Sequence, residues 1–143
     1  MIPSHVLVPL DGSPLAEEAL AHALSVFDCR LTVLNVVTPL DAGMSEGGIL
    51  ERDDERRAAA RERADRLIER VRDRTAAERR PIETVVVTGD PAAAILSYVE
   101  DHDVDHIVMG GHGGDRGQLS RRLLGTVATV VVGEAPATVT VVR

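Results

Sequence analysis

Apolar residues occur along this chain in five short and nearly continuous runs. The runs lie at residues 5–10, 31–37, 82–87, 106–109 and 137–142. An unbroken apolar run of this length is typical of a strand that is buried on both faces of a parallel sheet. We therefore predict five strands that are covered by helices on both sides.

The segments between these runs have helical patterns or glycine-rich composition. Ser13 is a suitable N-cap and Pro14 suits the first helical position, which predicts a helix that continues through Leu24. Residues 38–48 contain three glycines and a proline, which predicts a loop. Further helices are expected over about 50–79, over about 92–101, and from roughly 119 or 125 to 132.

The predicted helix over 50–79 carries many charges of both signs. Its apolar residues fall on one stripe, as expected for a helix that covers a sheet. They are Ala60, Ala64, Leu67, Ile68 and Val71. Acidic residues are interleaved with its arginines, and a mixed pattern of this kind indicates a solvated helix face.

Strands that alternate with long helical crossovers predict a parallel sheet with right-handed connections. We expect one domain over residues 1–143, an α/β fold of the Rossmann-like type with helices on both faces of a five-stranded sheet. Such sheets bind ligands beyond the carboxyl ends of their strands, at the point where the strand order reverses. With the order 3-2-1-4-5, that point lies between the first and fourth strands, which Asp11 and Gly110 follow.

Composition excludes several classes of chemistry. All sixteen basic residues are arginine, so the chain has neither the lysine of a Walker-type phosphate loop nor that of a Schiff-base enzyme. A net charge of −7 and only two aromatic residues argue against nucleic-acid binding, which rests on phosphate neutralisation and base stacking. Either a salty cytoplasm or a GC-rich genome would explain the acidic, lysine-free composition, and the sequence leaves both explanations open.

The chain also lacks signals for export or membrane insertion. Cys29 is the one cysteine, so no disulfide framework exists. Residues 1–5 have no signal-peptide character, and no apolar run approaches the ~20 residues of a membrane span. We therefore expect a cytoplasmic protein with no membrane partner and no nucleic-acid partner.

The segment after the fourth run is the main candidate for binding chemistry. Residues 110–125 read GGHGGDRGQLSRRLLG, and five of these residues are glycines that directly follow the predicted strand or lie within the next eight positions. Glycines let the backbone N–H groups approach an anion closely. Gly125 and Thr126 can open a helix, whose N-terminus favours phosphate. The sequence thus favours an anion site here over a plain connector.

Several other polar side chains are candidates for binding or catalysis. Asp11 can accept hydrogen bonds from a ribose or an adenine edge. His112 is more readily explained as a residue that orders the loop through backbone hydrogen bonds than as a catalytic base. His102 and His106 are four residues apart, but we expect a helix end and a strand start to separate them, so no metal site is predicted. No nucleophile with a base partner is recognisable.

Four stretches of the chain resemble the universal stress protein family. They are HVLVPLDGSPLAEEAL from residue 5, LTVLNVV from residue 31, GDPAAAILSYVEDHDVDHIVMGGHG from residue 89, and LLGTVATVVVGEAPATVTVVR from residue 123. The resemblance implies a parallel sheet in the order 3-2-1-4-5. It also implies a homodimer in which the last strands, residues 137–142, pair with each other.

The resemblance further implies a site for ATP or AMP, with Mg²⁺ when ATP is bound. In this reading Pro9, Leu10 and Asp11 line the nucleoside. The backbone of Val36 in the second strand faces the adenine, and Met109 and Gly110 at the end of the fourth strand flank the ribose. The remaining residues hold the phosphates. In chain order the implied site residues are Pro9, Leu10, Asp11, Val36, Met109, Gly110, Gly113, Gly125, Thr126 and Val127.

One feature departs from the family pattern. Nucleotide binders of the family carry G-x2-G-x9-G-[S/T], whereas eleven residues separate Gly113 from Gly125 in this chain. Loop-closure entropy grows slowly with length, so two extra residues cost little stability. They either bulge outward or push the loop across the pocket. The nucleoside half of the site is therefore better supported than the phosphate half.

These observations lead to one functional reading and one alternative. The chain resembles an adenine-nucleotide-binding stress-response or signalling protein with little or no turnover, at most slow ATP hydrolysis. The alternative is a dimeric protein-interaction module of the same fold that binds no nucleotide. Adenine-binding synthetases of related folds carry His-x-Gly-His after the first strand, whereas this chain has Asp11-Gly12-Ser13 there.

Overall fold

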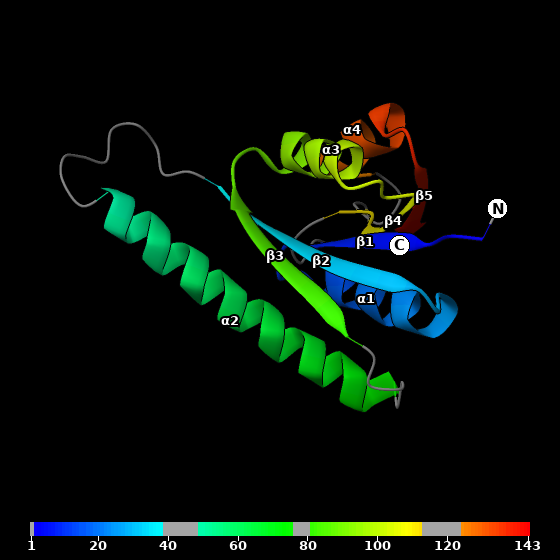
Figure 1. Ribbon diagram of the computed structural model, residues 1–143, viewed down its shortest axis with the longest axis horizontal. Coiled ribbons are helices and arrows are strands. Elements are labelled where there is room, and N and C mark those ends of the chain that lie inside the picture. Colours follow the sequence, from blue (N-terminus) through cyan, green and yellow to red (C-terminus); the bar gives the residue numbers. More distant parts are fainter. Residues whose placement is uncertain (1, 39–48, 76–80, 113–123) are drawn as a thin grey trace.

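A five-stranded sheet lies between two layers of helices in the computed structural model (Figure 1). The structure describes residues 2–38, 49–75, 81–112 and 124–143, and of residues 49–53 and 74–75 the backbone alone. Among these residues, no helix combines the length and the apolar character that crossing a bilayer requires.

Five strands and four helices alternate along the described chain. The strands are β1 (His5–Leu10), β2 (Arg30–Val37), β3 (Ile82–Thr88), β4 (His106–Gly110) and β5 (Thr138–Val142). The helices are α1 (Pro14–Val26), α2 (Ile49–Thr75), α3 (Pro91–Asp101) and α4 (Thr126–Glu134). The later of the two predicted starts for the last helix is therefore the correct one. Most of the predicted loop over 38–48 and the predicted end of α2 lie outside the described residues.

The sheet is entirely parallel and has the order β3-β2-β1-β4-β5, which confirms the expected topology. β1 pairs with β2 along its full length, from His5 beside Arg30 to Leu10 beside Asn35. Its pairing with β4 stops at Leu7, three residues before β1 ends. The strand order reverses between β1 and β4, so the predicted switch point is present.

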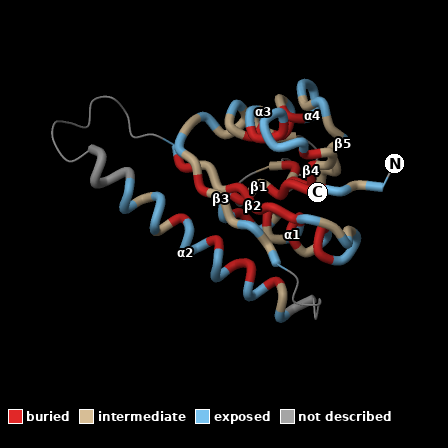
Figure 2. The backbone as a smooth tube through the Cα atoms, viewed as in Figure 1, coloured by how far each residue is buried: buried red, intermediate tan, exposed pale blue. Residues whose placement is uncertain are grey.

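Each face of the sheet is covered by its own pair of helices (Figure 1). The helices α1 and α2 pack on one face, and α3 and α4 on the other. Side chains of a strand alternate between faces, so Val8 and Leu10 contribute to the first core and Leu7 to the second. Figure 2 shows buried residues concentrated along the strands and on the inner side of α2.

Two helices begin with side-chain caps that the sequence encodes locally. The Ser13 hydroxyl accepts a hydrogen bond from Ala16 N at 3.2 Å, and Pro14 follows it. The Asp90 carboxylate accepts one from Ala93 N at 3.0 Å at the start of α3. Each cap satisfies an amide that the first helical turn leaves without an intrahelical partner. These caps fix where α1 and α3 begin relative to β1 and β3.

Part of the charged face of α2 covers the outer edge of the sheet. Arg57 donates from Nη2 to the Val86 carbonyl at 3.4 Å, and Arg61 donates from Nη1 to the Thr84 carbonyl at 3.0 Å. Residues two apart on a strand direct their carbonyls to the same edge, and residues four apart on a helix share a face. These arginines therefore shield edge strand β3, a role that the prediction of a solvated face omitted.

Candidate functional site

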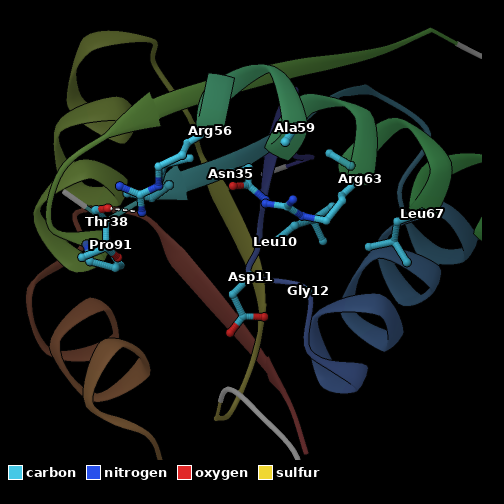
Figure 3. Close-up of a pocket in the computed structure, with 13 residues that line it drawn as sticks. Leu10, Asp11, Gly12, Asn35, Thr38, Arg56, Ala59, Arg63, Leu67 and Pro91 are labelled. Carbon is cyan, nitrogen blue, oxygen red and sulfur yellow. Dashed lines mark hydrogen bonds between the residues drawn. The ribbon is translucent and has the colours of Figure 1, made fainter. Parts of the chain in front are cut away.

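A pocket of about 570 Å³ lies at the carboxyl ends of β1 and β2, beneath α2 (Figure 3). This volume is within the range of small-molecule sites. The residues that line it are Leu10, Asp11, Gly12, Asn35, Val36, Val37, Thr38, Arg56, Ala59, Arg63, Ala64, Leu67 and Pro91. The pocket is thus built from two strand ends, the first turn after β1, one helix, and the start of another.

Three of the predicted site residues line this pocket, namely Leu10, Asp11 and Val36. Asp11 uses Oδ1 to accept a hydrogen bond from Ser13 N at 2.9 Å, a short local turn that sets the carboxylate just before α1. Gly12 between them has a φ of +82°, a left-handed conformation that favours glycine. The side chain of Asp11 is exposed, and Figure 3 shows it pointing away from α2.

Other predicted residues lie on the opposite face of the sheet. Met109 and Val127 belong to the core formed with α3 and α4, and Val36 packs against the same core. Side-chain alternation along β1 puts Pro9 on that face as well, because Leu10 faces α1 and α2. Only backbone atoms and side chains at the carboxyl edge therefore connect these residues with the pocket beneath α2.

Gly110 has a packing role of its own at the end of β4. A Cβ atom added there would lie 2.9 Å from Leu15 Cβ and 3.0 Å from the Leu15 backbone carbon. Such distances are shorter than real carbon contacts allow, and backbone cannot move aside cheaply. The glycine that was predicted to flank a ribose is required first for the close approach of β4 to α1.

The two ends of the glycine-rich segment are joined directly. Gly111 N donates to the Val142 carbonyl at 2.8 Å, and Gly125 N donates to the Gly111 carbonyl at 2.6 Å. A Cβ at Gly125 would lie 3.1 Å from His112 Cα, so the backbones are in close contact. Residues 113–123, including Gly113, lie outside the described residues. The start of α4 is nevertheless held at the end of β4 whatever the length of the segment between them.

The first turn of α4 begins beside this junction. Its N-cap is Gly125, which offers no side-chain cap, and Thr126 is exposed. A helix that begins without a side-chain cap leaves amide N–H groups of its first turn available to an outside acceptor. The predicted phosphate residues Gly125, Thr126 and Val127 are therefore together at a helix start, next to the end of β4.

Four polar residues of the pocket, Asn35, Thr38, Arg56 and Arg63, were not predicted as site residues. Arg56 donates from Nη2 to the Thr38 carbonyl at 2.6 Å, which ties α2 to the end of β2 (Figure 3). Arg63 lies seven residues later, two helical turns along the same face, and points into the pocket. Asn35 lines it from β2. The seven-residue spacing was a signal in the sequence, but only the packing of α2 reveals which face meets the pocket.

The histidines behave differently from one another. His112 has its Nδ1 buried, and this atom has no hydrogen-bond partner in the described part of the chain, whereas the ordering of the loop by this residue stays a prediction. His102 ends α3 with Nδ1 3.1 Å from the Tyr98 carbonyl, whereas His106 begins β4 with Nε2 2.7 Å from Thr140 Oγ1. No group of three or more potential metal ligands comes together among the residues that the structure describes.

Comparisons with known proteins agree with this architecture. The sequence model described as the Universal stress protein family matches residues 3–143. A universal stress protein of Methanocaldococcus jannaschii is 31% identical over 96% of this chain and 81% of its own length. The solved structure of the universal stress protein UspA from Lactobacillus plantarum covers 100% of this chain and 99% of its own, with 26% identity and a TM-score of 0.79.

Solved structures with lower identity share the same fold and contain adenine nucleotides. A universal stress protein in complex with cAMP has a TM-score of 0.68 at 23% identity, over 100% of this chain and 99% of its own. One from Archaeoglobus fulgidus in complex with dAMP has a TM-score of 0.59 at 19% identity, over 100% of both chains. A family protein of Arabidopsis thaliana with AMP bound has a TM-score of 0.61 at 18% identity, over 98% of this chain and 91% of its own.

Proposed function

Because this chain belongs to the universal stress protein family, we propose that it binds an adenine nucleotide, ATP or AMP, at the carboxyl end of its sheet. Its role is that of a stress-response or signalling module in the cytoplasm, with little or no turnover. Structures of this fold in complex with cAMP, dAMP and AMP support the choice of ligand.

The pocket at the ends of β1 and β2 is the observation that carries this proposal. Leu10, Asp11 and the Val36 segment, which the family resemblance assigns to the nucleoside, all line it. An acidic side chain at the end of a strand is the group that open α/β sheets use to accept ribose hydroxyls. In this proposal Pro9, Met109 and Gly110 complete the nucleoside side from the neighbouring strand ends.

The phosphates then lie at the start of α4. Gly125, Thr126 and Val127 offer backbone amides and one hydroxyl there, and the helix dipole adds partial positive charge. Gly113 completes this half, and Mg²⁺ accompanies ATP. The direct bond between Gly111 and Gly125 supports the phosphate half despite the longer loop, because it holds the helix start beside the end of β4.

Little turnover follows from the side chains near the pocket. Hydrolysis by general base catalysis requires a base that another group orients toward water. Within the described residues, His112 has no hydrogen bond at Nδ1 that would orient its ring. Slow hydrolysis through a metal ion and backbone electrostatics is the most that this arrangement supports.

The proposed assembly is a homodimer through residues 137–142. Within the described part of the chain β5 pairs with β4 alone, so its other side presents backbone groups that have no partner there. Such an edge pairs readily with a second copy around a two-fold axis. The same edge would serve the alternative function, a dimeric interaction module that binds no nucleotide.

The decisive experiment is calorimetric titration of nucleotide-free protein with AMP and with Mg-ATP, beside mass spectrometry of small molecules released on denaturation. Saturable heat with either nucleotide is expected. The variant Asp11→Asn keeps the acceptor for Ser13 N but loses the charge, and should bind about tenfold more weakly with an unchanged melting temperature. The matched control Asp101→Asn, at the exposed end of α3, should bind normally. Absence of heat at millimolar nucleotide would favour the interaction module.

A further inference from the structure

The pocket extends farther toward α2 than the proposed nucleotide contacts do. Leu10 packs in the core of α1 and α2, and Val37 packs against Ala60 of α2, so this side of the strand ends faces that helix. Alternation along β2 puts Asn35 on the same side as Val37. Met109 and Val127 lie on the other face. A nucleotide held as proposed therefore leaves the part beneath α2 for a further group.

The part of the pocket beneath α2 has both apolar and positively charged residues. Its apolar residues are Leu10, Val37, Ala59, Ala64 and Leu67. The side chains of Arg56 and Arg63 line it from α2, and that of Asn35 lines it from β2 (Figure 3). The pocket's acidic residue, Asp11, points away from α2 (Figure 3). Two cationic groups thus line one wall of a protein whose net charge is −7.

Arg63 is distinguished by the residues around it on α2. Its neighbours three and four positions away are Ala59, Ala60, Arg66 and Leu67, none of which is acidic. These are the positions from which a helix supplies ion-pair partners. Among the described residues Arg63 forms no hydrogen bond and no ion pair, although the helix is rich in acids. Arg66, in contrast, has acidic residues at these positions, because Glu62 lies four residues before it and Glu69 lies three residues after it.

Arg56 contributes a fixed second cation. Its Nη2 donates to the Thr38 carbonyl at 2.6 Å, which holds the side chain across the end of β2. A guanidinium has five N–H donors in a rigid planar arrangement, and this geometry matches phosphate and carboxylate oxygens. An ordered guanidinium with a second one two turns away is a suitable frame for an oxyanion.

We propose that the part of the pocket beneath α2 is an anion subsite in which Arg63, together with Arg56, binds a phosphate-type group beside the nucleotide. The inference rests on the proposed function, because it takes the nucleoside to lie at Asp11 and Val36. The anion is either a second phosphate on the ribose of the same ligand or a separate small oxyanion. In both cases Arg63 determines specificity between ligands with and without that group.

The first arm of the test compares AMP with adenosine 3′,5′-bisphosphate by calorimetry. The unaltered protein should bind the bisphosphate about tenfold more tightly than AMP, since a single charge-assisted hydrogen bond has an effect of that size. Arg63→Gln should abolish this difference and leave AMP affinity unchanged. The control Arg66→Gln, on the same helix but outside the pocket, should preserve it. Circular dichroism verifies that both exposed substitutions leave the fold intact.

The second arm titrates inorganic pyrophosphate into AMP-saturated protein. Binding that disappears in Arg63→Gln but not in Arg66→Gln identifies a separate oxyanion as the occupant, whereas a preference seen only in the first arm identifies a ribose phosphate. Normal AMP binding with no dependence on Arg63 in either arm would overturn the subsite and leave the proposed function standing. Failure to bind AMP would overturn the proposed function instead, and Arg63-dependent pyrophosphate binding would then support the subsite by itself.

Discussion

The two ends of the sheet use polar side chains in opposite ways. At the carboxyl end, Asp11, Asn35 and Arg63 line a pocket. At the amino end, His5 and Thr32 are buried and bonded to each other, with His5 Nε2 2.8 Å from Thr32 Oγ1. The second ring nitrogen of His5, Nδ1, lies 3.1 Å from the His102 carbonyl. Both ring nitrogens of this histidine are therefore occupied within the chain.

The amino-end network continues outward in the same manner. The Tyr98 hydroxyl donates to Glu83 Oε1 at 3.2 Å, and Arg30 forms an ion pair with Glu83 Oε2 at 3.1 Å. The Tyr98 ring stacks on His102 with ring centroids 3.8 Å apart. Hydrogen bonds inside the chain thus occupy the groups that face one another here, whereas the carboxyl end keeps donors and acceptors directed at a pocket. The hydrogen bonds at the amino end therefore account for its polar cluster as part of the fold.

The pKa values of several groups at the amino end are shifted by their surroundings in the chain. Burial lowers the pKa of His5 below its usual 6.5 and outweighs the hydrogen bond to the His102 carbonyl, which acts to raise it. The hydrogen bond from Arg30 lowers the pKa of Glu83. Burial alone would raise the pKa of Asp105, but hydrogen bonds from the Ser4 amide and hydroxyl and from the His5 amide outweigh it, and the pKa is lowered. These shifts at the amino end reflect burial for His5 and hydrogen bonding for Glu83 and Asp105.

The largest effect is expected for a substitution at Gly110, which tests whether residues at the carboxyl end of the sheet also have a structural role. Gly110→Val should lower the free energy of unfolding by about 3 kcal/mol, because a side chain there would collide with the backbone of Leu15. Gly133→Ala, which enters open space within α4, should be neutral or slightly stabilising. Urea denaturation measures both. Equal stability of the two variants would show that β4 and α1 approach less closely than described.

Thr32→Val probes the amino end directly. It should cost about 2 kcal/mol of unfolding free energy, because it leaves Nε2 of buried His5 without a partner. AMP affinity should not change. Thr88→Val, at the exposed end of β3, should have an effect within about 0.5 kcal/mol. Loss of AMP affinity in Thr32→Val at unchanged stability would contradict the assignment of this network to structure.

The pH dependence of stability should follow His5. Since its pKa is lower in the folded than in the unfolded state, the unfolded state binds the proton more readily. Stability is therefore complete above about pH 6.5 and falls as the pH drops through that value toward the folded-state pKa. Denaturation between pH 7.5 and 5.5 should show a shallower decline in His5→Gln than in the unaltered protein.

Some of the pH dependence should remain in His5→Gln. Burial also lowers the pKa of His106, so this second histidine contributes a loss of stability of the same sign in the same range. An unchanged slope in His5→Gln would assign the acid sensitivity to His106 alone. The buried network around His5 would then make no contribution to the pH dependence of stability.

The smallest effect is expected for the exposed ion pair. Arg30 and Glu83 have side chains that are 55% and 45% exposed, so Arg30→Gln should cost less than about 1 kcal/mol. Raising the salt concentration should reduce the difference from the unaltered protein, because salt screens exposed charges. Denaturation curves at low and high salt measure this. A larger, salt-independent loss would mean that Arg30 supports the buried network through Glu83 and Tyr98.

Much of the fold follows from local pattern. The five apolar runs correspond to the five strands, and Ser13 and Asp90 begin helices at the residues where their side chains can cap them. Strands and caps are encoded within a few residues, so the sequence alone locates them. The place of Asp11 at the pocket was predictable for the same reason, because it directly follows a buried strand.

Contacts between distant elements required the tertiary structure. No local pattern relates Gly110 to Leu15, and no local pattern reveals that Arg56 and Arg63 face a pocket while Arg57 and Arg61 cover β3. On a helix, one residue turns a side chain by about 100°, so its partners depend on how the whole helix rotates against the sheet. That rotation is determined by the packing of Ala60, Ala64, Leu67, Ile68 and Val71 against the sheet and α1. The sequence by itself thus determined the elements and the end of the sheet where the pocket lies, whereas packing decided which charged side chains meet there.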